Sequence, residues 1–129
     1  MSYMNEPISF KPATTIGAYR IVTANTGTAN VVKLAATAAE RPIGISKDTV
    51  KDTVSGIPII CYGIARLFFG DTIASGRMVA ARSDGSGQGV LHVDVTAGSY
   101  IVGVLIGADV ALTGTIADVL VGVGFKSIP

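Results

Sequence analysis

The sequence predicts an all-β fold: a small β-barrel or sandwich built from two similar β units, preceded by an extended N-terminal arm. Three features lead to this prediction, namely an internal repeat, the alternation of apolar with polar residues, and glycine-rich turns. We expect the arm to cover residues 1–14 and a single β domain to cover residues 15–129. At most one short helix is expected, because the helix-forming stretches at 34–40 and 47–54 are short.

The internal repeat is the strongest of these features. Residues 15–24, TIGAYRIVTA, align with residues 72–81, TIASGRMVAA, at an offset of 57. Three more segments align at an offset of 59: 31–34 with 90–93, 42–45 with 101–104, and 63–65 with 122–124. The two units therefore span residues 15–69 and 72–129. Two such units, packed about a pseudo-twofold axis, remove most free strand edges.

The alternation has a period of two, which predicts strands rather than helices. Residues 91–96 and 117–125 alternate between apolar and polar or small side chains, as expected for strands buried on one face. Residues 57–69 and 101–106 instead carry apolar residues on both faces, which predicts strands covered on both sides by the fold or by another subunit. The glycine-rich run at 84–89 is interpreted as the tip of a hairpin.

Charge and hydropathy exclude several kinds of partner. The net charge is +1, from ten basic and nine acidic residues without a run of like charge, so we expect no nucleic-acid and no membrane partner. The N-terminus lacks the basic and apolar blocks of a secretory signal. Residues 101–125 are long and apolar enough to span a bilayer, but Asp109 and Asp118 would each cost several kcal/mol in lipid. We therefore expect strands there.

The sequence offers no set of residues for catalysis or for binding a cofactor or metal, and we expect a protein that is not an enzyme. His92 and Cys61 are the only residues of their kinds. His92 falls on the polar face of an alternating strand, where a solvated or interfacial role is favoured over that of a general base. Cys61 lies in an apolar run and is expected to be buried. Zinc requires convergent ligands and calcium requires clustered oxygens, which this sequence does not supply.

Three short motifs of small and apolar residues indicate a family. They are RPIGIS at 41–46, GIARL at 63–67 leading into GDTIASG at 70–76, and GVLIGA at 103–108. On these motifs the chain, over about residues 15–123, resembles the capsid decoration (cement) proteins of tailed bacteriophages. The resemblance implies a structural virion protein, made in the host cytoplasm, that binds the outer surface of an icosahedral head. It also implies a homo-oligomer, commonly a trimer, that stabilises the head by bridging neighbouring major capsid subunits.

The composition agrees with such a role. Only 15% of residues are charged, which leaves apolar surface for a partner, and a cyclic oligomer covers such surface with one repeated interface. Pro7 and Pro12 favour an extended arm, which offers apolar anchors to a partner. The candidate residues for capsid binding or intersubunit contact are Tyr3, Met4, Ile8, Phe10, Arg20, Arg66 and Arg77.

Two alternatives remain open. One is a glycan-binding or surface-binding β module displayed on a virion, which would require exposed aromatic side chains from the four Tyr and four Phe. The other is a carrier domain, because the turn at 70–76 is similar to a Gly-Asp-x-[IV]-x-x-Gly turn of biotinyl and lipoyl domains. Carrier domains hold the modified lysine at a hairpin tip, in settings such as Met-Lys-Met. No lysine lies in that setting among Lys11, Lys33, Lys47, Lys51 and Lys126.

Overall fold

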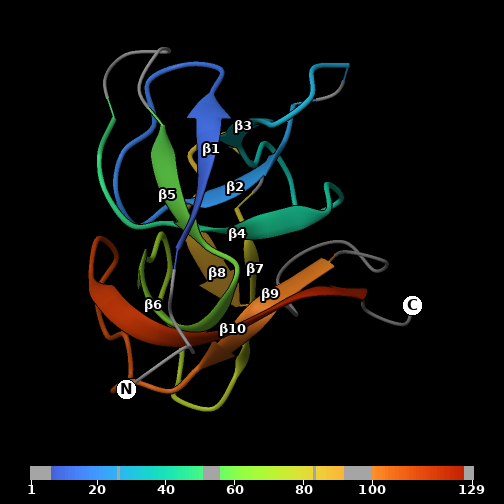
Figure 1. Cartoon of the computed structure of the whole chain (residues 1–129). Helices are drawn as coiled ribbons and strands as arrows, with labels where there is room; N and C mark the ends of the chain where they lie inside the picture. The colour runs from blue at the N-terminus through green and yellow to red at the C-terminus, as the bar shows by residue number, and fades with distance from the viewer. Residues whose placement is uncertain (1–6, 26, 51–55, 83, 92–99, 127–129) are drawn as a thin grey trace.

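The computed structural model describes residues 7–25, 27–50, 56–82, 84–91 and 100–126, with side chains up to Gly122 in the last range. The fold is all-β, as predicted, and no helix occurs in these ranges. The strands form a first β group, β1–β5, and a second β group, β6–β10 (Figure 1). The strands are β1 (Ile8–Pro12), β2 (Ile21–Ala24), β3 (Val31–Leu34), β4 (Pro42–Ser46), β5 (Ile57–Ile60), β6 (Tyr62–Phe68), β7 (Met78–Ala81), β8 (Gly89–Leu91), β9 (Tyr100–Leu105) and β10 (Ile116–Lys126).

The first β group is a closed barrel with the strand order β1-β3-β2-β4-β5. β1 closes it, because this strand pairs in parallel with β3 and antiparallel with β5. Residues 8–12, which belong to the predicted arm, are therefore extended and hydrogen-bonded on both sides within the barrel. Residues 1–6 of the arm lie outside the described residues.

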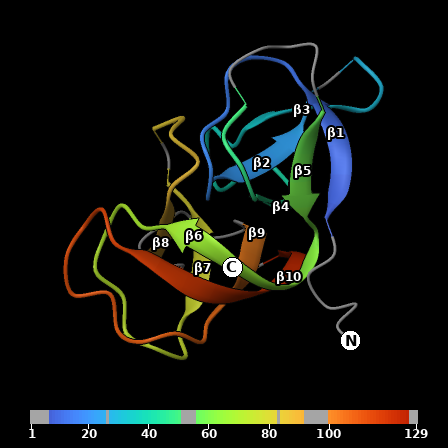
Figure 2. The same ribbon diagram turned by 60° about the vertical axis from the view of Figure 1, so that its left-hand side comes forward.

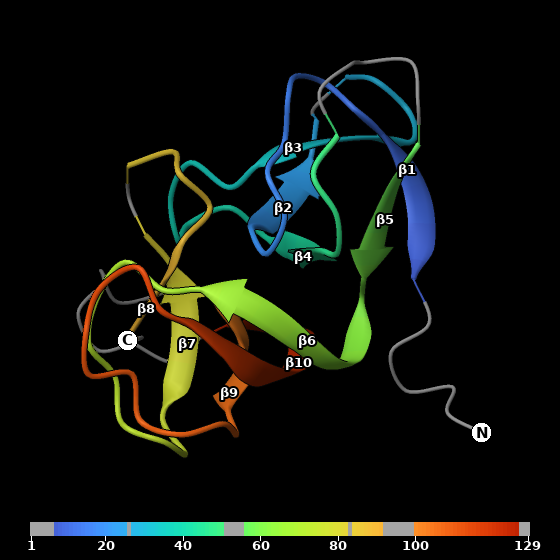
Figure 3. The same cartoon turned by 90° about the vertical axis from the view of Figure 1, so that its left-hand side faces the viewer.

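The second β group is a five-stranded sheet with the order β6-β10-β9-β7-β8. Its edge strands approach each other at one parallel bridge, between Phe69 and Gly89. β5 leads into β6 through Cys61. The barrel and the sheet lie one above the other (Figures 2 and 3). No helix among the described residues is long and apolar enough to cross a membrane. The apolar stretch at 101–125 contains β9 and β10, as the sequence predicts.

The strand registers show that the two groups share one pattern of pairing. Val22 pairs with Leu34 and Gly44 in the first group. In the second group Val79 pairs with Leu91 and Gly103 in the same way. The equivalence includes β1 and β6, because Ile8 pairs with Ile59 as Ala65 pairs with Val119. It therefore extends further towards the N-terminus than the repeat visible in the sequence.

Two parts of the sequence alignment require correction. It aligned residues 31–34 with 90–93, but the hairpin registers make Leu34 equivalent to Leu91. The offset thus remains 57 through the β7–β8 hairpin, and the additional residues of the second unit follow β8. It also aligned residues 63–65 with 122–124, but Gly63, Ile64 and Ala65 lie in β6, the equivalent of β1, and pair directly with Val121, Leu120 and Val119 of β10. The turn at 84–89 is the hairpin tip that the sequence predicts, and Gly85 and Gly87 have positive φ angles of 77° and 70°.

Two equivalent glycines explain part of the repeated sequence motif. Gly44 in β4 and Gly103 in β9 lie where a neighbouring strand passes very close. A Cβ at Gly44 would collide with the carbonyl oxygen of Ile60, and one at Gly103 with that of Leu120. Only glycine fits at either crossing, which accounts for the shared apolar-glycine-apolar pattern of the two strands.

The hydrophobic core has two parts. A small cluster fills the barrel: Ile16, Val22, Val32, Ile57 and Ile59. A larger cluster lies between the groups, where Ile21, Ile45 and Ile60 of the barrel pack with the inner face of the second sheet, including Leu67 and Phe69. Backbone hydrogen bonds join the groups as well, from Phe68 N to Tyr19 O at 2.9 Å and from Ile21 N to Gly87 O at 2.7 Å.

Candidate interaction surface

The outer face of the second sheet carries exposed apolar side chains in regular alternation. Along β6, Tyr62, Ile64 and Arg66 are exposed, and the residues between them are buried. This is the pattern expected when one face of a strand meets the core and the other meets solvent. We define the outer face of the second sheet by the following residues: Tyr62, Ile64, Arg66, Met78, Val104, Ile106, Ile116, Asp118 and Leu120.

The strand registers place four of these apolar residues in one row. Ile64 pairs with Leu120, Leu120 with Val104, and Val104 with Met78, so the row crosses β6, β10, β9 and β7. Residues paired in this way share one face of a sheet and contact one another. The outer face holds six of the eight large hydrophobic residues that are exposed in the described part of the chain. Such a concentration of apolar surface is typical of an interaction site.

A pair of opposite charges lies within this apolar face. Arg66 on β6 pairs directly with Asp118 on β10, and both residues are exposed. Two shallow grooves meet at this pair, with volumes of about 340 Å³ and 360 Å³, and both are lined by Arg66 and Asp118. The larger groove continues to Ile116 and Ala117, and the other reaches Tyr19 and Lys47 of the barrel. A partner therefore meets apolar side chains around one basic and one acidic group.

Tyr19, at the edge of the smaller groove, has an unusual backbone conformation. Its φ angle is +64°, in the left-handed region that is unfavourable for residues other than glycine. The equivalent residue in the second group is Gly76, with a φ angle of +84°. A tyrosine thus occupies a position where the other copy of the unit has glycine. Strained residues of this kind concentrate at functional sites, which supports a role for this groove.

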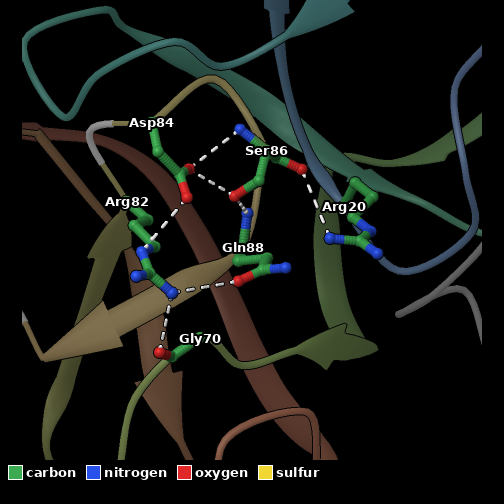
Figure 4. Close-up of polar contacts among 6 residues, drawn as sticks. All are labelled: Arg20, Gly70, Arg82, Asp84, Ser86 and Gln88. Carbon is green, nitrogen blue, oxygen red and sulfur yellow. Dashed lines mark hydrogen bonds and ion pairs between the residues drawn. The ribbon is translucent and has the colours of Figure 1, made fainter.

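The hairpin tip between β7 and β8 is fixed by its own polar network (Figure 4). Arg82 Nη1 donates to Gly70 O at 2.9 Å, and Arg82 Nε lies 3.2 Å from Asp84 Oδ2. The hydrogen bond from the Ser86 hydroxyl lowers the pKa of Asp84, with smaller contributions from Ser86 N–H and the Arg82 guanidinium. These contacts stabilise the glycine-rich loop at 84–89 as a turn, which is a structural role.

Arg20 joins this tip to the barrel. Its Nη1 donates to Ser86 O at 3.4 Å (Figure 4). Its guanidinium carbon lies 4.3 Å from the centre of the Phe68 ring. These contacts hold the first β group against the second. The contacts of Arg20 in this structure are thus within the chain, although the sequence offered it as a candidate for contact with a partner.

The other candidate residues lie in different places. Arg66 is on the outer face of the second sheet, whereas the exposed Arg77 lines a different groove, together with Ile73 and Leu91. Ile8 is exposed at the start of β1 in the barrel, and Phe10 packs partly against the barrel core. Tyr3 and Met4 lie outside the described residues. Of the candidates among the described residues, the structure therefore places Arg66 on the outer face of the second sheet.

Sequence reasoning did not single out the apolar residues of the outer face. The signal was present, because residues 57–69 and 101–106 were recognised as apolar on both faces, which predicts a second covering partner. Those stretches contain Ile64 and Val104. What the pattern lacked was the strand register, which joins them to Leu120 and Met78 in one row.

The described residues show no group of three His, Cys, Asp or Glu side chains able to hold a metal ion. Cys61 is half-buried rather than fully buried, and it packs against the barrel core. This burial raises the pKa of its thiol and makes the reactive thiolate less available. His92 lies outside the described residues.

Comparison with solved structures gives an informative match. Scans against protein-family models and against curated proteins find no match. Among solved structures, the chain matches the head fiber gp8.5 N base in bacteriophage phi29 with a TM-score of 0.68. The match covers 90% of this chain and 92% of the other, at 14% sequence identity. The two chains share one fold.

This neighbour bears on the resemblance found in the sequence. It is a protein of a bacteriophage head, so the predicted resemblance to capsid-associated proteins of tailed phages is confirmed. At 14% identity the agreement concerns the fold alone.

Proposed function

We propose that this chain is a structural virion protein that binds the outer surface of an icosahedral phage head and stabilises the head by bridging neighbouring major capsid subunits. The observation that carries the proposal is the fold match to a phage head fibre base over nine-tenths of the chain. We further propose that it acts as a homo-oligomer, with a trimer favoured. A trimer on a shell engages several sites together, so modest affinity at each site gives lasting attachment.

The surface of the chain supports this proposal. A decoration protein acts by binding. The outer face of the second sheet, which holds most of the exposed large hydrophobic residues of the described chain and few charges, is suited to this. The two β groups share a core and a set of backbone hydrogen bonds, so each subunit is a rigid unit that can transmit force between its contacts. Separating two bridged capsid subunits would then also require breaking the contacts of the decoration protein.

The proposal is tested with heads of the phage that encodes this chain, prepared with and without the protein. Heads are heated in steps, and genome release is followed with a DNA-binding dye. We expect bare heads to release DNA at a lower temperature, and re-added protein to co-sediment with heads and restore the higher temperature. Equal release temperatures for bare and decorated heads would contradict the stabilising role, and failure to co-sediment would contradict binding.

The role of the N-terminal arm requires a restricted deletion. Removal of residues 1–14 would also remove β1, which closes the barrel between β3 and β5. Deleting residues 2–6 leaves every described strand in place. If the arm contributes to attachment, this variant should stay folded by circular dichroism and bind heads more weakly. Unchanged head binding would restrict attachment to the remainder of the chain.

The alternative, a glycan-binding module on a virion, has one observation in its favour. Tyr62 is 46% exposed on the outer face, beside Ile64, and aromatic side chains commonly stack on sugars. A glycan array separates the two functions. Specific binding that is lost in Tyr62→Ala would favour the glycan module, whereas no glycan binding together with co-sedimentation with heads favours the structural role.

A further inference from the structure

The two β groups contain the same apolar row in opposite environments. In the first group Ile21 pairs with Ile45, and Ile45 with Ile60. The equivalent row of the second group is Met78, Val104 and Leu120, which have the same pairing. Ile21 and Ile45 are fully buried and Ile60 is 6% exposed, whereas Met78 is 49% and Leu120 is 42% exposed.

The cover over the first row is known. Ile21, Ile45 and Ile60 belong to the larger core cluster, together with residues from the inner face of the second sheet such as Leu67. The outer wall of one β group is thus buried by another β group of the same fold. Among the described residues, no such cover lies over the corresponding wall of the second group, where Met78 and Leu120 are exposed.

We infer that the outer face of the second sheet is the surface through which this chain binds a second copy of itself. The inference rests on the proposed function in one respect, the expectation of a homo-oligomer, and it adds the surface that the copies share. In the first β group the equivalent row is already buried by the second β group, and each copy of the chain contains β groups of this fold. Permanent interfaces between identical subunits are apolar in the same way as a domain core.

The charges on this face favour a copy of the chain as the occupant. Arg66 and Asp118 are exposed within apolar surroundings, and burial of either charge without a partner would be costly. A surface that offers one acidic and one basic group can pair with both of these charges. A second copy offers these groups in equal number, and the net charge of +1 produces little repulsion between copies.

The inference is tested by sedimentation velocity of the purified full chain from about 1 to about 100 µM, a range over which self-association becomes visible. Leu120→Glu and Ile64→Glu each place a charge in the middle of the apolar row. Leu112→Glu is the matched control, since Leu112 is 73% exposed but lies outside the outer face. We expect the wild-type chain and the control to form the same oligomer, and both row variants to dissociate with a constant raised about 100-fold or more.

Circular dichroism and thermal melting show whether the variants are folded. Arg66→Asp alters an exposed side chain at the same face and gives a further folded variant, in which association should also weaken. A wild-type chain that remains monomeric at the highest concentration would overturn the inference. Row variants that keep the oligomer while folded would overturn it equally.

Co-sedimentation with heads separates this inference from the proposed function. If Leu120→Glu loses the oligomer and the wild-type chain does not bind heads, the proposed function fails and the assigned surface stands. If Leu120→Glu keeps the oligomer but loses head binding, the outer face contacts the shell and the inference is overturned. If Leu120→Glu is monomeric and binds heads only weakly, both stand, because attachment then depends on several linked sites.

Discussion

The first and second β groups share strand order and register but differ in what they contribute. The first is a closed barrel with its own small core around Ile16 and Val32. The second is a sheet whose inner face is completed by the barrel. Of the two similar units, the first thus covers the inner face of the second, and the second has an exposed outer face. Burial at equivalent positions depends on the neighbour and cannot be assigned from the unit alone.

The largest expected effect comes from truncating the equivalent residues Ile21 and Met78. Ile21→Ala should lower the free energy of unfolding by about 3 kcal/mol, because it leaves a cavity in the core between the groups. Met78→Ala should change it by about 0.5 kcal/mol or less, since this side chain is 49% exposed. Urea denaturation of both variants measures the difference, at a concentration where the oligomeric state is the same. Similar losses for the two would contradict the assigned difference in burial.

A smaller effect is expected at Thr23, whose equivalent in the second group is Ala80. Both residues are buried, but the Thr23 hydroxyl has no hydrogen-bond partner. An unpaired buried hydroxyl is destabilising, so Thr23→Val, which keeps the shape, should raise the free energy of unfolding by about 1 kcal/mol. Thermal melting measures this gain. A fall in the melting temperature would indicate that the hydroxyl is satisfied in solution, for example by a bound water.

The smallest expected effect concerns Glu40, in a turn of the first β group. Partial burial tends to raise the pKa of this carboxyl, but hydrogen bonds from Lys33 Nζ at 2.6 Å and from the Ala36 and Thr37 amides outweigh it and lower the pKa. A lowered pKa in the folded state stabilises the protein above the ordinary value, about 4.5, and this contribution is lost as the pH falls through the lowered pKa.

Glu40→Gln should therefore cost about 0.5 kcal/mol at neutral pH, since the Lys33–Glu40 pair is about a third exposed. The difference from the wild-type chain should shrink as the pH is lowered below 4.5. Melting temperatures measured from neutral to acidic pH test this. A difference that stays constant with pH would assign the effect to packing of the side chain.

The sequence predicted the all-β class and the duplication, because alternation and repeated turns are local signals. It did not reveal which apolar row is covered: Ile21 and Met78 lie in matching contexts, and only the contact between the groups distinguishes them. The pairing of β1 with β3 and β5 also escaped prediction, since it joins distant segments and residues 8–12 share little sequence with β6. The sequence singled out Arg66 as an exception in an apolar run, but its position opposite Asp118 required the strand register.

The closure of the barrel by β1 has a consequence for the order of folding. β1 is synthesised early, yet Ile8 pairs with Ile59, so its pairing with β5, which closes the barrel, must wait until most of the first β group has been made. The second sheet in turn requires the finished barrel to cover its inner face. We therefore expect the barrel to form first during synthesis and the later half to pack onto it. Such distant pairing makes folding slow, and the nascent chain is exposed to mispairing until β5 has emerged from the ribosome.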